Sequence, residues 1–126
     1  MNNKIRFLSV VDDEQVIVSV FRYALSQIDG IKFFGFTNSS VALKHFKLNK
    51  YQYGLVLSDY KLPEMDGIQL LKQVKLLNPK VRTLLMSAFE LEHEVFEECK
   101  CVNTFIQKPV DLPELIEIVK IQLSEP

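Results

Sequence analysis

Three carboxylates, one hydroxyl and one ammonium group stand out in this sequence: Asp12, Asp13, Asp59, Ser87 and Lys108. Carboxylates held close together repel one another and need a cation, and a ligand set of oxygen atoms alone favours Mg²⁺, Ca²⁺ or Mn²⁺ over zinc. A lysine in the same pocket supplies a point charge suited to a phosphoryl group. Such a set predicts a phosphoryl-transfer site, with an aspartate as the candidate nucleophile and an acyl phosphate as the product.

Taken singly, each of these residues also has a structural explanation. Asp12 or Asp13 could cap a helix, Asp59 could begin a turn, and Ser87 could cap another helix. Lys108 could be a solvated loop lysine. The chemical interpretation therefore depends on whether the fold brings the five side chains together.

Short β-rich runs alternate with helical stretches along the whole chain. The expected strands are Lys4–Val11, Ile31–Phe36, Tyr53–Ser58, Val81–Met86 and Val102–Gln107. The expected helices are Glu14–Ile28, Asn38–Asn49, Ile68–Leu77, Glu90–Cys99 and Leu112–Leu123. Because each parallel strand pair needs a crossover connection, this alternation predicts an α/β fold, a doubly wound (βα)₅ parallel sheet with helices on both faces.

The five polar residues follow the carboxyl ends of the expected strands. Asp12 and Asp13 follow the first strand, Asp59 the third, Ser87 the fourth and Lys108 the fifth. In open parallel sheets, ligands bind beyond the carboxyl ends of the strands, beside the point where the strand order reverses. We therefore expect these side chains to converge on one edge of the sheet.

Length and charge narrow the classes of function. The chain has 126 residues, with 15 Lys and Arg against 16 Asp and Glu, and a pI near 6.1. These values predict one globular domain over residues 1–126 and argue against a polybasic surface for nucleic acid or membrane. The sequence has no signal-peptide pattern and no apolar stretch long enough to span a membrane, and Cys99 and Cys101 are too close for an unstrained disulfide. The expectation is a cytoplasmic protein with reduced thiols.

Four motifs resemble those of the receiver domain of two-component response regulators, from about Lys4 to Leu123. They are VVDDE (Val10–Glu14), LSDYKLPEMDG (Leu57–Gly67), LLMSAF (Leu84–Phe89) and FIQKP (Phe105–Pro109). The resemblance implies a flavodoxin-like sheet of strand order 2-1-3-4-5. It also implies a signalling phosphoacceptor, not an enzyme acting on other molecules.

The resemblance assigns roles to the residues at the strand ends. Asp59 would accept a phosphoryl group from a partner histidine kinase or histidine phosphotransfer protein. Mg²⁺, or Mn²⁺ in its place, would be held by Asp12, Asp13 and Asp59 together with the backbone carbonyl of Lys61, with Asp13 the most direct ligand. Lys108 would pair with the phosphoryl oxygens.

The resemblance also implies how the signal leaves the site. Ser87 would be the switch hydroxyl, and Phe105 takes the place of the switch aromatic, where tyrosine is frequent. The Lys108–Pro109 peptide would be cis. The readout surface would comprise residues 90–99, 102–107 and 112–123, which would contact a downstream protein or output domain and could form a weak dimer, with no direct contact to nucleic acid.

Other readings of the sequence remain open. A receiver-like interaction module that is never phosphorylated would share the fold. An aspartyl-phosphate hydrolase of the haloacid dehalogenase kind would require the pattern Asp-x-Asp after the first strand, whereas Asp12 and Asp13 are adjacent. A flavodoxin-like cofactor binder would want a Thr/Ser/Gly-rich phosphate loop there, and none is present.

Overall fold

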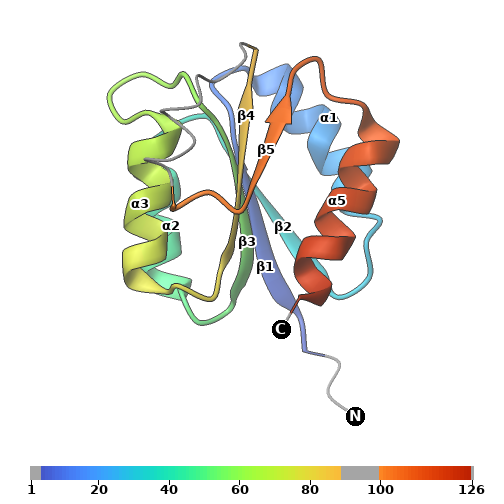
Figure 1. The fold of residues 1–126 in the computed structure, drawn as a ribbon, viewed down its shortest axis with the longest axis horizontal. Coiled ribbons are helices and arrows are strands. Elements are labelled where there is room, and N and C mark those ends of the chain that lie inside the picture. The colour runs from blue at the N-terminus through green and yellow to red at the C-terminus, as the bar shows by residue number, and fades with distance from the viewer. Residues whose placement is uncertain (1–3, 89–99, 126) are drawn as a thin grey trace.

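The computed structural model describes residues 4–88 and 100–125 and contains a five-stranded parallel sheet of order β2-β1-β3-β4-β5 (Figure 1). The strands are β1 (Arg6–Val11), β2 (Ile31–Phe36), β3 (Tyr53–Asp59), β4 (Arg82–Ser87) and β5 (Thr104–Gln107). The helices are α1 (Gln15–Leu25), α2 (Ser39–Asn49), α3 (Gly67–Leu77) and α5 (Leu112–Ser124). The predicted fold class and strand order are confirmed.

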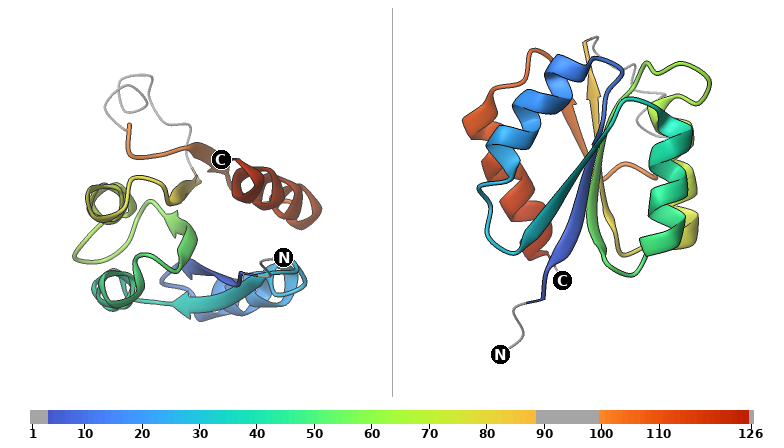
Figure 2. Two further views of the ribbon diagram at one scale, coloured as in Figure 1. Left: turned by 90° about the horizontal axis from the view of Figure 1, so that it is seen from below. Right: turned by 180° about the vertical axis from the view of Figure 1, so that it is seen from behind.

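Helices cover both faces of the sheet. Helices α1 and α5 lie on one face, and α2 and α3 lie side by side on the other (Figures 1 and 2). The two cores are apolar: Leu8, Leu55, Leu84 and Leu115 belong to the first, and Phe46, Leu71, Val74 and Leu85 to the second. A sheet buried on both faces needs nearly continuous apolar strands, which explains sequences such as RFLSVV and YGLVLSD.

Local capping fixes where two helices begin. The Asn38 side chain accepts a hydrogen bond from the Val41 amide at 3.0 Å and so caps α2, as its position in the sequence suggests. Helix α3 begins with a capping box in which Asp66 and Gln69 each accept from the other's backbone amide. The expected helix at 68–77 therefore starts one residue earlier, at Gly67.

Several expected elements are longer than the observed ones, and the first strand begins at Arg6, not at Lys4. The first helix ends at Leu25, not at Ile28, since the chain turns at 26–30 and Gly30 takes a positive φ of 81°. Ile28 still packs on the core, which is why it extends the apolar pattern past the true end. The fifth strand begins at Thr104, not at Val102. The preceding residues are held by Thr83, whose hydroxyl donates to the Cys101 carbonyl and whose backbone carbonyl accepts from the Asn103 amide.

Some predictions lie outside the described residues. The expected helix over 90–99 is one of them, together with Phe89 and Cys99. Cys101 is a half-buried free thiol. No helix in residues 4–88 or 100–125 is both long and apolar enough to cross a membrane.

Candidate functional site

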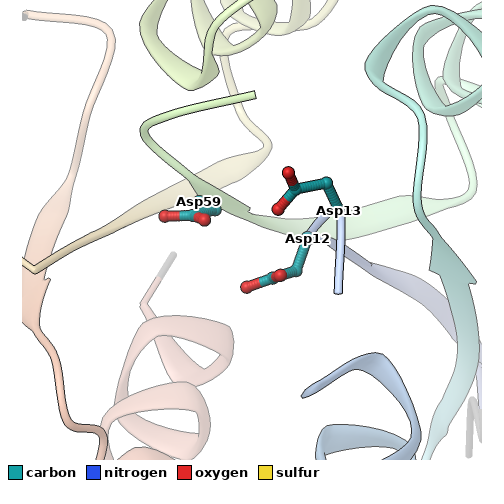
Figure 3. Close-up of side chains that lie close together, drawn as sticks. All are labelled: Asp12, Asp13 and Asp59. Atoms are coloured by element: carbon teal, nitrogen blue, oxygen red, sulfur yellow. The ribbon is translucent and has the colours of Figure 1, made fainter. Parts of the chain in front are cut away.

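Three carboxylates meet where β1 and β3 end. Asp12 and Asp13 follow the last residue of β1, and Asp59 is the last residue of β3. Each offers a carboxylate oxygen, and these oxygens lie within 4.8 Å of one another (Figure 3). Asp12 is fully buried, Asp59 is mostly buried, and Asp13 is exposed. Two acidic groups are therefore fixed inside the protein while the third faces solvent.

Lys108 reaches this cluster from the end of β5. Its Nζ atom lies 3.2 Å from Oδ2 of Asp59 and 3.3 Å from Oδ2 of Asp12. Its backbone amide donates to the Ser87 carbonyl at 2.8 Å, which ties the lysine to the end of β4. The peptide to Pro109 is cis, as the resemblance implied. The structure thus brings Asp12, Asp13, Asp59 and Lys108 together.

Burial and the neighbouring charges have opposing effects on the pKa values of Asp59 and Lys108. Burial raises the pKa of Asp59, with a further increase from Asp12, while Lys108 and the Tyr60 amide oppose the rise. Burial alone would lower the pKa of Lys108, but the carboxylates of Asp59 and Asp12 outweigh it and raise that pKa. The lysine therefore stays cationic between the two buried acids.

The donor set fits a hard divalent cation. Oxygen atoms around an octahedral Mg²⁺ are separated by about 3 to 4 Å, given metal–oxygen distances of about 2.1 Å. The carboxylate oxygens of Asp12, Asp13 and Asp59 come close to that spacing, and no sulfur or imidazole ligand lies among them. One exposed ligand, Asp13, leaves the cation open to water, which Mg²⁺ retains in most protein sites. Residues Asp12, Asp13 and Asp59 would hold the ion.

The remaining predicted site residues lie on β4, on β5 and just after β3. Ser87 is the buried last residue of β4 and pairs with Gln107 in the sheet. Phe105 is half-buried on β5, opposite Leu85, and packs on the core beneath α2 and α3. Lys61 is exposed, two residues after Asp59.

Gly67, which lies just before the helix expected over 68–77, also shapes this site. A Cβ on Gly67 would lie 2.2 Å from the Asp59 carbonyl oxygen and 2.7 Å from Cδ1 of Leu85. The Gly67 amide donates to the Tyr60 carbonyl at 2.8 Å, so α3 begins directly against the end of β3. The sequence signal was a glycine right after the capping residue Asp66, but the contact itself depends on the fold.

The chain matches a known family over most of its length. Residues 8–120 match the family model of the response regulator receiver domain. The chain is 31% identical over 122 residues to sporulation initiation phosphotransferase F of Bacillus subtilis, covering 95% of this chain and 93% of that protein. Other relatives are much longer: the match to the DNA-binding transcriptional regulator NtrC of Escherichia coli is 31% identical over 116 residues, with 91% of this chain but 24% of that protein covered.

The fold is also similar to solved structures. The crystal structure of a response regulator receiver domain protein (CheY-like) from Methanospirillum hungatei superposes with a TM-score of 0.82 at 26% identity, covering 95% of this chain and 94% of the other. The resemblance inferred from the four motifs is confirmed.

Proposed function

Because this chain belongs to the response regulator receiver domain family, we propose that it is a signalling switch that accepts a phosphoryl group on Asp59. Residues 1–126 would form one receiver domain with its core over about 4–123. The observation that carries the proposal is the position of the Lys108 Nζ atom, 3.2 Å from Asp59 and 3.3 Å from Asp12, inside a cluster of three carboxylates. A lysine so placed can neutralise charge on a phosphoryl group attached to Asp59.

The reaction is a displacement at phosphorus. An Asp59 carboxylate oxygen attacks the phosphorus of a phosphohistidine on a kinase or phosphotransfer protein, and the P–N bond breaks as the O–P bond forms. The electron pair of that bond stays on the imidazole nitrogen, which is protonated. A bound Mg²⁺ would supply charge neutralisation for the phosphoryl oxygens. Asp12, Asp13 and Asp59 would hold that ion, while Lys108 would bind a phosphoryl oxygen.

Transfer of the phosphoryl group changes which arrangement of the site is most stable. Phosphorylation adds charge and three acceptor oxygens at Asp59. Lys108 and Ser87 are the nearby donors, and an arrangement that draws both toward the phosphoryl group is favoured in the modified protein. Movement at Ser87 would pass to Phe105, because the strands that carry them are paired. Phe105 has no hydroxyl, so its part in the switch is a change of packing.

A stripe on α1 is suited to contact the phosphodonor protein. Val16, Val20 and Tyr23 are spaced i, i+4 and i+7 and are 71%, 39% and 77% exposed. Helix α1 begins two residues after Asp13, so this stripe starts next to the carboxylates. Val20→Glu should weaken transfer from a protein donor while leaving transfer from a small phosphoramidate unchanged.

Intact-mass spectrometry after incubation with a small phosphoramidate or acyl phosphate and Mg²⁺ tests the proposal. The native chain should gain about 80 Da, the mass of one HPO₃ group, and the chelator EDTA should abolish the gain. Asp59→Asn should gain nothing. Asp29→Asn is the matched control, because Asp29 is an exposed aspartate in the turn before β2.

Two outcomes would refute the phosphoacceptor assignment. An equal mass gain in Asp59→Asn would place the modification elsewhere. No gain in the native chain with either small donor or with a histidine kinase would favour an interaction module that works without phosphorylation.

A further inference from the structure

A groove between α2 and α3 takes no part in the function proposed above. It has a volume of about 580 Å³, within the range of about 300 to 1,000 Å³ typical of ligand sites. We call it the α2–α3 groove, and its lining residues are Leu43, Lys47, Glu64, Met65, Gln69, Lys72 and Gln73. Helices α2 and α3, which carry most of these residues, lie on the face of the sheet opposite α1 and α5 (Figure 2).

Lysines predominate around the α2–α3 groove, and Glu64 is the one acidic residue among its lining residues. Helices α2 and α3 contain lysines but no aspartate or glutamate, although the whole chain has a net charge of −1. Lys47 lines the groove from α2 and Lys72 from α3, and Lys44 lies one turn before Lys47 on an exposed face. In residues 4–88 and 100–125, neither Lys47 nor Lys72 forms an ion pair. Each of the two helices therefore contributes one lysine without an ion pair to the lining of the groove.

Lys75, which is also on α3, differs from these lysines because its ammonium group is hydrogen-bonded within the protein. Its Nζ atom donates to the Val81 carbonyl at 2.7 Å and to Oδ1 of Asn103 at 2.8 Å. These bonds tie α3 to the residues that come just before β4 and β5. Among the described residues, no hydrogen bond or ion pair engages the ammonium group of Lys47 or Lys72 in this way.

Apolar surface accompanies these lysines. Leu43 and Met65 line the groove, and Leu76, which is 79% exposed, lies one turn beyond Lys72 and Gln73 on α3. Apolar surface beside charged side chains matches the general arrangement of protein interfaces, in which a more apolar centre has a polar rim. Such a surface complements a segment that alternates acidic and apolar residues.

We propose that the α2–α3 groove binds an acidic segment of a protein partner, one whose carboxylates pair with Lys47 and Lys72 and whose apolar residues contact Met65 and Leu76. Glu64 favours a peptide over a nucleic acid. It lines the same groove, and it would repel a uniformly charged phosphate backbone, whereas a peptide can place a polar or basic residue against it. This binding does not depend on phosphorylation of Asp59.

Differential selection from a library of random dodecapeptides tests the proposal with the unphosphorylated native chain. Phage that bind the native chain but not the Lys47→Glu/Lys72→Glu variant are kept. The recovered peptides should be rich in Asp and Glu with interspersed apolar residues. Their affinity should fall about tenfold in the variant, because each reversal replaces an attraction by a repulsion.

Matched variants separate this site from general charge attraction. Lys4→Glu/Lys120→Glu makes the same change of charge on exposed lysines outside the groove and should leave binding intact. Lys47→Arg/Lys72→Arg should retain binding, and circular dichroism should show that all variants fold. Failure to recover any peptide, or recovery of peptides without acidic residues, would overturn the proposal. Stronger competition by duplex DNA or by anionic lipid vesicles than by the free peptide would overturn the assignment to a protein partner.

Discussion

Replacing Gly67 by alanine should damage both the fold and the site, because the added methyl group meets backbone. The Cβ would lie 2.2 Å from the Asp59 carbonyl oxygen, about 1.2 Å inside the 3.4 Å at which ordinary contact begins. The obstructing carbonyl belongs to the last residue of β3, which is paired with Met86 in β4. It cannot swing away as a flexible side chain would.

The expected cost in free energy of unfolding is about 2 kcal/mol. Overpacking a core costs roughly 1 to 3 kcal/mol, and this contact belongs near the upper end because strand backbone must move. Alanine in a helix regains about 0.5 to 1 kcal/mol relative to glycine. A displacement of about 1 Å at a reacting group lowers reaction rates by about a hundredfold, so phosphorylation of Asp59 should also fall steeply.

Urea unfolding followed by circular dichroism measures the first effect, and intact-mass spectrometry with a small phosphodonor measures the second. Gly54→Ala is the matched control, since its Cβ would meet side-chain carbons at 3.0 and 3.2 Å that can shift by tenths of an ångström. Its cost should stay below about 1 kcal/mol. If Gly67→Ala were as stable as Gly54→Ala and were phosphorylated at the native rate, the steric reasoning would be wrong.

Three further predictions concern the charges. The Lys108→Gln variant should accept a phosphoryl group at least about tenfold more slowly, because a charge-assisted hydrogen bond is lost. It should bind Mg²⁺ no more weakly than the native chain. Mass spectrometry measures the rate of phosphorylation, and isothermal calorimetry measures the affinity for Mg²⁺. Mg²⁺ at about 100 times its Kd should raise the Tm of this 126-residue chain by about 10 °C, and Asp13→Asn should reduce that rise in a thermal scan. Burial lowers the pKa of His45 below its ordinary value of 6.5. Below pH 6.5 the unfolded chain therefore binds a proton at His45 more readily than the folded chain does. As the pH falls through this range, the free energy of unfolding should fall. Urea titrations across this range should show a shallower fall in His45→Gln, and equal slopes would refute the role of His45.

The sequence alone determined the architecture. Alternating strand and helix periodicities predict a parallel sheet, because chain connectivity leaves few other ways to bury every apolar face. The types of residue at the strand ends then predict the oxygen-rich site with its lysine, since parallel strands bring their carboxyl ends to one edge. Element ends were less accurate. Ile28 and Val102 pack on the core from a turn and a loop, so their apolar character extended the helix and the strand too far.

Only the tertiary structure decided how groups from distant parts of the chain meet. Lys108 lies between Asp12 and Asp59 because β5 and β1 end at the same edge of the sheet. The distances between these side chains cannot be read from the sequence. The groove with Lys47 and Lys72 exists because α2 and α3 pack side by side, and this packing fixes the distance between the two helices. Periodicity records which face of an element is buried, whereas contact between two elements depends on the packing of every side chain between them.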